Sequence, residues 1–309
     1  MTSWLRARLP ILLFMPLLLC VAGVRAAPAV LVVSSEMDGA YEQVANAITR
    51  ELQLSDPAAA VDIVSREAFR ARSLDGIRTI VTIGALAAGE VILAAPPMPV
   101  LHTLVPRETF ARLASSTTRT GDSAIFVDQP ADRQIAAIRA ALPEWQRLAL
   151  IAGPQTHELV AHLARIAGAE GFEVVVREIK SDRELFAAMQ QIMSRPAVLL
   201  AVPDGEIFNS HTIQNILLTS YRQRSPVVGF SPAYVRAGAL LALYATPAQI
   251  GKQAADAISS VLNGGRLPPP SHSHEYEVGV NLTVARSLGI HPRSAETIKS
   301  VLNRREIVE

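Results

Sequence analysis

Residues 29–54 read AVLVVSSEMDGAYEQVANAITRELQL, and this stretch decides the fold. Its first five residues form a continuous apolar run, which is typical of a strand covered on both faces in a parallel sheet. From Ala40 to Leu54 the apolar residues recur at helical spacing. A buried strand followed by an amphipathic helix is the repeating unit of an α/β protein.

The same alternation of strand and helix continues along the chain in two series. The first has further strands at 61–64, 79–83 and 99–104 and a helix at 85–93; the second has strands at 124–127, 147–152, 172–179, 197–202 and 226–230, with helices at 131–142, 157–169, 182–193 and 207–222. Strands joined by helices imply right-handed crossovers between parallel strands. Two series of similar length predict an α/β protein of two Rossmann-like lobes with parallel sheets, and the chain is long enough for two domains.

The C-terminal segments are too short for a third domain. They comprise an expected strand at 240–244, a capped helix at 246–262, a proline connector at 268–270, a strand at 276–280 and a helix from about Leu282. These segments fit as returns that complete the two lobes, so that a three-strand hinge joins them. We therefore expect lobe 1 to comprise residues 27–122 and 246–266, and lobe 2 to comprise residues 123–245 and 267–309.

Residues 1–26 have the pattern of a secretory signal peptide. Two arginines precede an apolar run over residues 11–24, and the segment ends in Val24-Arg25-Ala26, with small residues at the −3 and −1 positions. The run is shorter than the roughly 20 residues of a membrane-spanning helix, which argues against an uncleaved anchor. Cys20 lacks the small preceding residue of a lipoprotein signal. We expect cleavage after Ala26 and export to the periplasm.

Removal of that segment changes the charge balance. Three arginines are lost, so Lys plus Arg falls from 29 to 26 while Asp plus Glu stays at 28, and the net charge becomes −2. A near-neutral surface gives no basis for binding nucleic acid or an anionic membrane. Cys20 is the only cysteine, and its removal excludes a thiol nucleophile, a cysteine metal site and a disulfide in the mature chain.

Polar and small residues follow several of the expected strands, at the edge where parallel sheets bind ligands. These loops are Ser34-Ser35-Glu36, Gly84-Ala85-Leu86, His102-Thr103, Gly153-Pro154-Gln155-Thr156, Pro203-Asp204-Gly205 and Phe230-Ser231-Pro232. Hydroxyl groups and free backbone N–H groups there can hold a carboxylate or another polar group, and Phe230 or Tyr234 can cover an apolar part. Each position also has a structural interpretation, with serine or threonine as a helix cap, Asp204 as a turn residue and Phe230 as core.

Signals for catalysis and for cofactors are weak. Neither a glycine-rich dinucleotide motif nor a P-loop occurs in the sequence. The segment Gly229-Phe230-Ser231-Pro232-Ala233 departs from a nucleophile elbow at its last position, and Pro232 lacks the N–H that an oxyanion hole needs. The segment His272-Ser273-His274-Glu275 could ligate a metal, but we expect a solvated polar loop there. The expectation is therefore a protein that is not an enzyme, with no metal and no cofactor.

Several segments in order resemble one known family. They are Asp128-Gln129-Pro130-Ala131-Asp132-Arg133-Gln134, Val202-Pro203-Asp204, Pro226-Val227-Val228-Gly229-Phe230-Ser231, Tyr234-Val235-Arg236-Ala237-Gly238-Ala239-Leu240, Gln249-Ile250-Gly251 and Val280-Asn281-Leu282-Thr283-Val284-Ala285-Arg286-Ser287-Leu288-Gly289-Ile290. They resemble the ABC transporter substrate-binding family that includes tryptophan-binding lipoproteins. The resemblance covers most of the mature chain and implies the type I periplasmic-binding-protein fold, with a ligand held between lobes that close by hinge motion.

The resemblance also implies where the ligand would be contacted. Together with the strand-end argument it gives the candidate ligand-binding residues Ser34, Ser35, Ala85, Thr103, Asp128, Gln155, Asp204, Phe230 and Ser231. One departure concerns the loop after Thr103, where the family usually has an acidic residue beside a proline and this chain reads Leu104-Val105-Pro106-Arg107. Arg107 in place of a carboxylate argues against an amino-acid ligand.

The leading functional hypothesis is the periplasmic solute-binding component of an ABC transporter, with two lobes that close on a small organic ligand. Its expected partners are that ligand and an ABC permease or another membrane protein, with no nucleic acid, and the chain is expected to be a monomer. The alternative keeps the fold but makes the chain a ligand-sensing or accessory binding module, coupled to a sensor kinase or an outer-membrane receptor.

Overall fold

The structure is a computed structural model, and it describes residues 29–57, 59–209 and 211–306. The expected signal peptide therefore lies outside the described residues. Within them, each helix is too short or too polar to cross a membrane.

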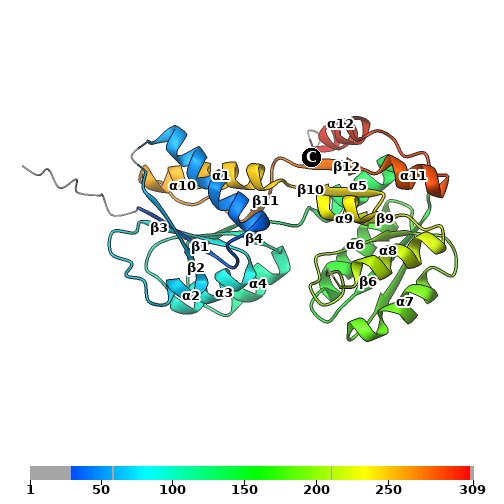
Figure 1. The fold of residues 1–309 in the computed structure, drawn as a ribbon, viewed down its shortest axis with the longest axis horizontal. Helices are drawn as coiled ribbons and strands as arrows, with labels where there is room; N and C mark the ends of the chain where they lie inside the picture. The colour runs from blue at the N-terminus through cyan, green and yellow to red at the C-terminus, as the bar shows by residue number, and fades with distance from the viewer. Residues whose placement is uncertain (1–28, 58, 210, 307–309) are drawn as a thin grey trace, which may run out of the picture.

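The first lobe is built on a six-stranded parallel sheet with the order β11-β5-β4-β3-β1-β2. Its strands are β1 (Val30–Ser34), β2 (Val61–Ser65), β3 (Thr79–Ile83), β4 (Val100–Val105), β5 (Ser123–Phe126) and β11 (Ser271–His272). Its helices are α1 (Gly39–Ser55), α2 (Arg66–Phe69), α3 (Ala85–Ala94), α4 (Arg107–Ser115) and α10 (Pro247–Leu262). Figure 1 shows α1 and α10 on one face of this sheet and α2, α3 and α4 on the other. All five residues of β1 are buried, as its apolar run predicts.

The second lobe has a six-stranded sheet with the order β12-β10-β9-β8-β6-β7. Its strands are β6 (Arg147–Ala152), β7 (Glu173–Glu178), β8 (Val198–Leu200), β9 (Val227–Gly229), β10 (Leu241–Tyr244) and β12 (Glu277–Val280), and only β12 runs antiparallel to its neighbour. Around it lie α5 (Ala131–Ala141), α6 (His157–Ala169), the short 3₁₀ helix η1 (Asp182–Glu184), α7 (Leu185–Ile192), α8 (Ile213–Arg222), α9 (Pro232–Ala237), α11 (Leu282–Leu288) and α12 (Ala295–Glu306). One aliphatic core fills this lobe.

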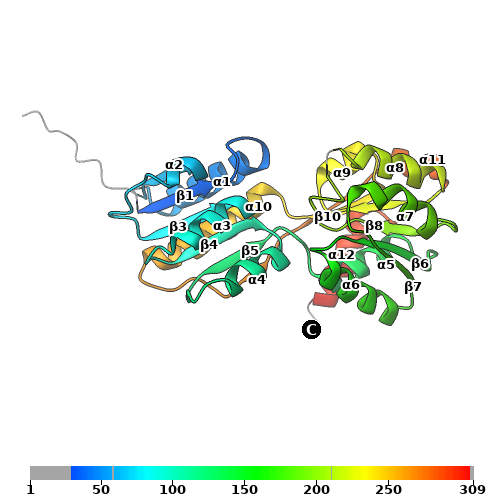
Figure 2. The same cartoon turned by 90° about the horizontal axis from the view of Figure 1, so that it is seen from below.

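The chain passes between the two sheets three times, after β5, after β10 and after β11 (Figure 2). This confirms the predicted α/β fold of two lobes with a three-strand hinge. The expected lobe boundaries at residues 123 and 267 were wrong in one respect. Both β5 and β11 belong to the first sheet, because β5 pairs with β4 and β11 pairs with β5. The apolar run at 124–127 predicts a strand but does not indicate which strand it pairs with, so the sequence alone does not place it in the first sheet.

Two other local predictions differ from the structure. The helix expected from residue 207 begins only at Ile213, because the side chains of Asp204, Asn209 and Thr212 bind nearby backbone groups and shape the preceding residues into turns. The segment from His272, expected to be a solvated loop, begins in a strand. His272 pairs with Phe126 of β5 and its ring lies against the Phe126 ring at a centroid distance of 5.2 Å.

The helix that enters lobe 1 from the hinge is fixed at both its start and its middle. Thr246 and Gln249 form a capping box at the start of α10, in which the Thr246 side chain accepts from the Gln249 N–H and the Gln249 side chain accepts from the Thr246 N–H. Further along, Gly251 packs so closely on α1 that an added Cβ would overlap the Cβ of Ala47. The absence of a side chain at Gly251 therefore allows α10 and α1 to approach.

Candidate ligand-binding site

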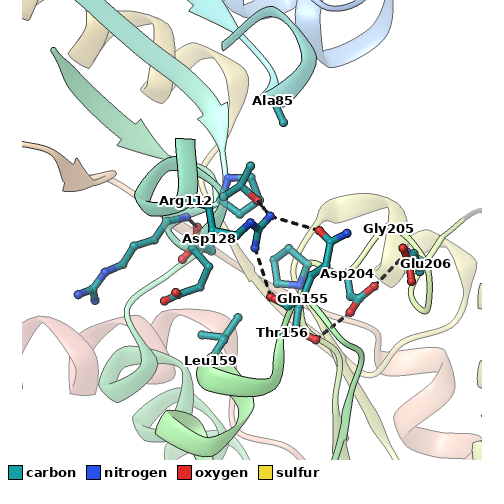
Figure 3. Close-up of a pocket in the computed structure, with 14 residues that line it drawn as sticks. Ala85, Arg112, Asp128, Gln155, Thr156, Leu159, Asp204, Gly205 and Glu206 are labelled. Carbon is teal, nitrogen blue, oxygen red and sulfur yellow. Dashed lines mark hydrogen bonds between the residues drawn. The ribbon is translucent and has the colours of Figure 1, made fainter. Parts of the chain in front are cut away.

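A cavity of about 320 Å³ lies between the lobes, where loops at the carboxyl ends of strands from both sheets meet (Figure 3). Residues from lobe 1, from lobe 2 and from the first crossing segment line it: Ala85, Pro106, Arg107, Glu108, Thr109, Arg112, Asp128, Gln155, Thr156, Leu159, Pro203, Asp204, Gly205 and Glu206. This volume is within the range of small-molecule sites in proteins.

Asp204 organises the lobe 2 side of the cavity. Its Oδ2 accepts from the Thr156 hydroxyl at 2.8 Å, and its Oδ1 accepts from the backbone N–H groups of Glu206 at 3.0 Å and Ile207 at 3.2 Å. The Thr156 hydroxyl in turn accepts from the Gly153 N–H at 3.0 Å. The buried Asp204 carboxylate thus joins the loop after β8 to the loop after β6. A Cβ at Gly153 would overlap the Asp204 carboxylate, so this glycine leaves the space that the carboxylate occupies.

Asp128 has a similar role on the first crossing segment. Its carboxylate is buried, and its Oδ1 accepts from the Arg107 backbone N–H at 2.8 Å, at the first residue of α4. The residue before α4 is Pro106, which supplies no side-chain cap, so Asp128 satisfies one of the free N–H groups of the helix. The other oxygen of Asp128 lies 3.5 Å from Nε2 of His272. Asp128 therefore connects α4, the first crossing segment and β11.

The end of β4 has an irregular backbone that places α4. Its pairing with β5 shifts register between Thr103 and Val105, and Leu104 between them has a φ of 50°. A non-glycine residue in this region is strained, and such bulges commonly re-aim the chain beside functional sites. The bulge brings Pro106 and the first turn of α4 to the cavity.

Arg112 of α4 reaches across the cavity to the opposite lobe (Figure 3). Its guanidinium donates to the Gln155 side-chain oxygen at 3.2 Å and to the Gln155 carbonyl at 3.5 Å, and to the Thr109 hydroxyl on its own helix at 3.3 Å. These distances are at or beyond the long end of ordinary N–H···O hydrogen bonds. Arg112 and Gln155 are both exposed, so the link between the lobes is weak and accessible to water.

The first loop of lobe 1 supports the cavity without lining it. The Ser35 hydroxyl accepts from the Ala87 N–H at 2.9 Å and so caps α3, the helix after the neighbouring strand β3. Gly84 has a φ of 92°, and a Cβ there would meet the side chains of Ser35 and Tyr41. This packing presents Ala85, at the start of α3, to the cavity (Figure 3).

Four of the nine candidate residues line the cavity: Ala85, Asp128, Gln155 and Asp204. The other five have local roles. Ser34 donates to the Glu36 carbonyl, Thr103 donates to the Thr82 carbonyl at 2.9 Å, and Ser35 caps α3. The Phe230 ring lies 4.7 Å from the Tyr234 ring, and Ser231 is the residue before α9. Ligand contact by any of the nine remains a prediction.

Several lining residues were not selected from the sequence, chiefly those of α4. The sequence places the end of this strand near His102-Thr103, whereas β4 continues to Val105, so residues further along the chain reach the cavity. Arg112 is on the second turn of α4, where its position carries no sequence signal. Thr156 is the residue before α6, but its hydroxyl makes no capping hydrogen bond to that helix and binds Asp204 instead.

A buried histidine lies behind α4. Burial lowers the pKa of His102 to about 4; nearby Asp122 raises this pKa and Arg119 lowers it. Its Nδ1 is 2.8 Å from the Thr82 hydroxyl, and its ring lies 5.5 Å from that of Phe110 on α4. His102 is therefore neutral near pH 7 and part of the packing that holds α4 on the sheet. Metal binding has no support in the described residues, which contain no group of three or more His, Cys, Asp or Glu side chains suited to an ion.

Comparisons with known proteins identify the family. No curated protein matches the sequence. The sequence model of the ABC transporter substrate binding protein family matches residues 55–300. The chain belongs to this family. The match confirms the resemblance noted from the sequence, and the family consists of substrate-binding proteins.

Solved structures share the fold of this ABC transporter substrate-binding protein. A ligand-free, open substrate-binding protein with adhesive properties from Clostridium difficile is 16% identical, with a TM-score of 0.73, covering 88% of this chain and 98% of that one. An ABC domain in complex with L-Trp from Streptococcus pneumonia is 17% identical, with a TM-score of 0.67 and the same coverage. A conserved domain protein from Vibrio cholerae is 19% identical, with a TM-score of 0.67, covering 90% of this chain and 98% of that one. At these identities the similarity establishes the fold alone.

Proposed function

We propose that this chain is the periplasmic solute-binding component of an ABC transporter, and that its lobes close on a small organic ligand in the cavity between them. The observation that carries the proposal is the shared lining of that cavity, with Ala85 and Arg112 from lobe 1 and Gln155 and Asp204 from lobe 2. A ligand that touches both lobes favours the closed state, because it binds that state more tightly than the open one. Of the two functions left open by the sequence, the family match favours the transporter component.

The hinge and the cavity lining suit this motion. Each lobe has its own sheet and core, so the lobes can rotate as rigid units about the three crossing segments. Near the cavity the lobes are joined by the long hydrogen bonds of Arg112 to Gln155, which break and re-form at little cost in free energy. The buried bonds of Asp204 and Asp128 lie within the loops and keep the cavity walls intact while the lobes move.

The proposal includes export and partners. The signal pattern of residues 1–26 supports cleavage after Ala26 and function in the periplasm, where an ABC permease would receive the ligand. The chain would act as a monomer and carry out no chemistry on the ligand. Support for this last point is that both buried carboxylates have structural partners: Asp204 accepts from Thr156, Glu206 and Ile207, and Asp128 accepts from the N–H of Arg107.

Ligand-dependent thermal stabilisation of the exported chain tests the proposal. A ligand that binds only the folded state raises the apparent stability, by about 2.7 kcal/mol at a concentration of 100 times Kd. The screen should contain amino acids, aromatic compounds, small acids and sugars, and mass spectrometry should identify any co-purified ligand. We expect a shift with at least one class, and no shift together with no co-purified ligand would contradict the proposal.

Two variants of α3 provide a matched control for the site. Ala85→Trp places a large side chain in the cavity, whereas Leu93→Trp makes the same new residue at an 83% exposed position of the same helix, outside the cavity. The ligand-induced shift should be lost in Ala85→Trp and retained in Leu93→Trp. An equal shift in both variants would place the ligand elsewhere.

A further inference from the structure

We propose that the solute carries a carboxylate with no neighbouring ammonium group, and that Arg112 binds this carboxylate. The inference rests on the proposed function, because it names the chemistry of the ligand for the same cavity. It follows from which charged groups of the lining already have partners and which do not.

The cations that line the cavity have no carboxylate partner among the described residues. Arg112 contacts only neutral oxygens, those of Gln155 and Thr109, and the Arg107 side chain makes no hydrogen bond or ion pair there. Several arginines elsewhere in the molecule have acidic partners, as in the pairs Arg70–Glu90, Arg119–Asp122 and Arg133–Glu306. Others, such as Arg139 and Arg177, hydrogen-bond only to neutral oxygens. A guanidinium binds a carboxylate in a bidentate manner, and such charge-assisted bonds are stronger than those to neutral acceptors. A ligand carboxylate would therefore displace the Gln155 oxygens from Arg112.

The buried anions of the cavity, in contrast, are already bound. Asp204 accepts from one hydroxyl and two backbone N–H groups, and Asp128 accepts from the Arg107 N–H beside His272. Both oxygens of Asp204 already accept hydrogen bonds, so a ligand ammonium at Asp204 would have to share them with these donors. Asp204 is therefore a poor anchor for an amine, and Oδ2 of Asp128 lies 3.5 Å from Nε2 of His272.

The lining also contains two glutamates, Glu206 and Glu108, which are the other candidates to hold a ligand ammonium group. Glu206 is exposed and lies on the far side of Asp204 from Arg112 (Figure 3). Glu108 is in the first turn of α4, where a negative charge is stabilised by the helix dipole without any ligand. A water-exposed ion pair contributes little binding energy, so Glu206 is a poor anchor for an ammonium group. Glu108 is the competing anchor, and a variant tests it directly.

The remaining lining fits the organic part of such a solute. Ala85, Leu159 and Pro203 offer apolar contacts from both lobes. Near Leu159, the start of α6 has no side-chain cap, because the Thr156 hydroxyl is committed to Asp204. The partial positive charge of that helix end is a second group, beside Arg112, that attracts an anion.

Matched compounds separate the two charges of an amino acid. Each triplet holds the amino acid, its deaminated acid and its decarboxylated amine: L-phenylalanine, 3-phenylpropanoate and 2-phenylethylamine; L-tryptophan, indole-3-propanoate and tryptamine; L-norleucine, hexanoate and pentylamine. Calorimetric titration of the exported chain should give tightest binding for the deaminated acid in any triplet that binds. Tighter binding of the amino acid or of the amine would overturn the inference and leave the proposed function standing. Binding of no carboxylate would also overturn it, and the wider thermal screen would then decide the proposed function alone.

Variants assign the anion to Arg112. Arg112→Gln should weaken binding of the acid by at least about tenfold, since a charged hydrogen-bond partner is lost. Arg183→Gln makes the same charge change at an exposed position in η1, outside the cavity, and should leave affinity within about twofold. Glu108→Gln should leave binding of the acid unchanged or tighter. A loss of affinity in Glu108→Gln with none in Arg112→Gln would refute the assignment.

Discussion

The buried carboxylate of Asp204 is the sharpest place to test how the cavity is built. It accepts three hydrogen bonds, from Thr156, Glu206 and Ile207, and is 6% exposed. At about 1 kcal/mol for each net hydrogen bond, Asp204→Ala should lower the free energy of unfolding by about 3 kcal/mol. Asp204→Asn keeps an oxygen for the two backbone N–H groups and loses only the acceptor of the Thr156 hydroxyl, so it should cost about 1 kcal/mol.

Urea unfolding of the Asp204→Ala and Thr156→Val variants, singly and combined, measures this directly. The double-mutant cycle should give a coupling energy of about 1 kcal/mol, because each single variant removes the same side-chain hydrogen bond. A domain of ordinary stability survives a loss of about 3 kcal/mol, so Asp204→Ala should remain folded and bind ligand more weakly through the loosened Gln155 loop. A cost below about 0.5 kcal/mol, with no coupling to Thr156, would refute the role assigned to Asp204.

Three further predictions concern residues that support the site. The pKa of His102 is near 6.5 in the unfolded chain and about 4 in the folded chain, so the unfolded state binds more protons between these two values. The free energy of unfolding should therefore fall by about 2 kcal/mol from pH 7 to pH 5. Urea titrations of His102→Gln should show a weaker pH dependence, and an unchanged pH dependence would contradict this role of His102. Gly251→Ala should destabilise the folded protein by about 1–3 kcal/mol, because the added methyl group clashes with Ala47. Gly89→Ala, within α3 where a Cβ has room, should be neutral or stabilising. Thermal unfolding measures both, and equal effects would argue against close packing of α10 on α1. Thr246→Ala removes the cap of α10 beside the hinge and should cost about 1 kcal/mol, while a neutral effect would show that the capping box is dispensable.

The sequence predicted the architecture because both sheets leave strong local signals. Apolar runs such as residues 30–33 and 148–152 become fully buried strands, and the helix start at Thr246-Pro247 has the chemistry of a cap. What local signals could not supply was the pairing partner of a strand. Residues 123–126 look the same whichever sheet they join, and only tertiary contacts place β5 beside β4.

The candidate site was predicted in part for the same reason. The carboxyl ends of parallel strands share an edge, and the strand-end residues Ala85, Gln155 and Asp204 line the cavity there; their contact with a ligand stays a prediction. Arg112 was missed because its place in the cavity depends on the bulge at Leu104 and on the Asp128 carboxylate that holds the start of α4. Neither the bulge nor this contact is encoded in a local pattern.

The measurement that most directly tests closure of the lobes is the distance between two nitroxide labels, one on each lobe, with and without the compound that gives the largest thermal shift. Labels at Leu93 of α3 and Phe186 of α7 are on exposed positions outside the cavity, and a pair at Leu54 and Leu93 within lobe 1 is the control. If the hinge closes, adding the ligand should shift the distribution of distances between the labels at Leu93 and Phe186 and make it narrower. The distances between the control labels should not change. Saturating ligand that binds in the cavity but leaves the inter-lobe distances as they were would contradict the account.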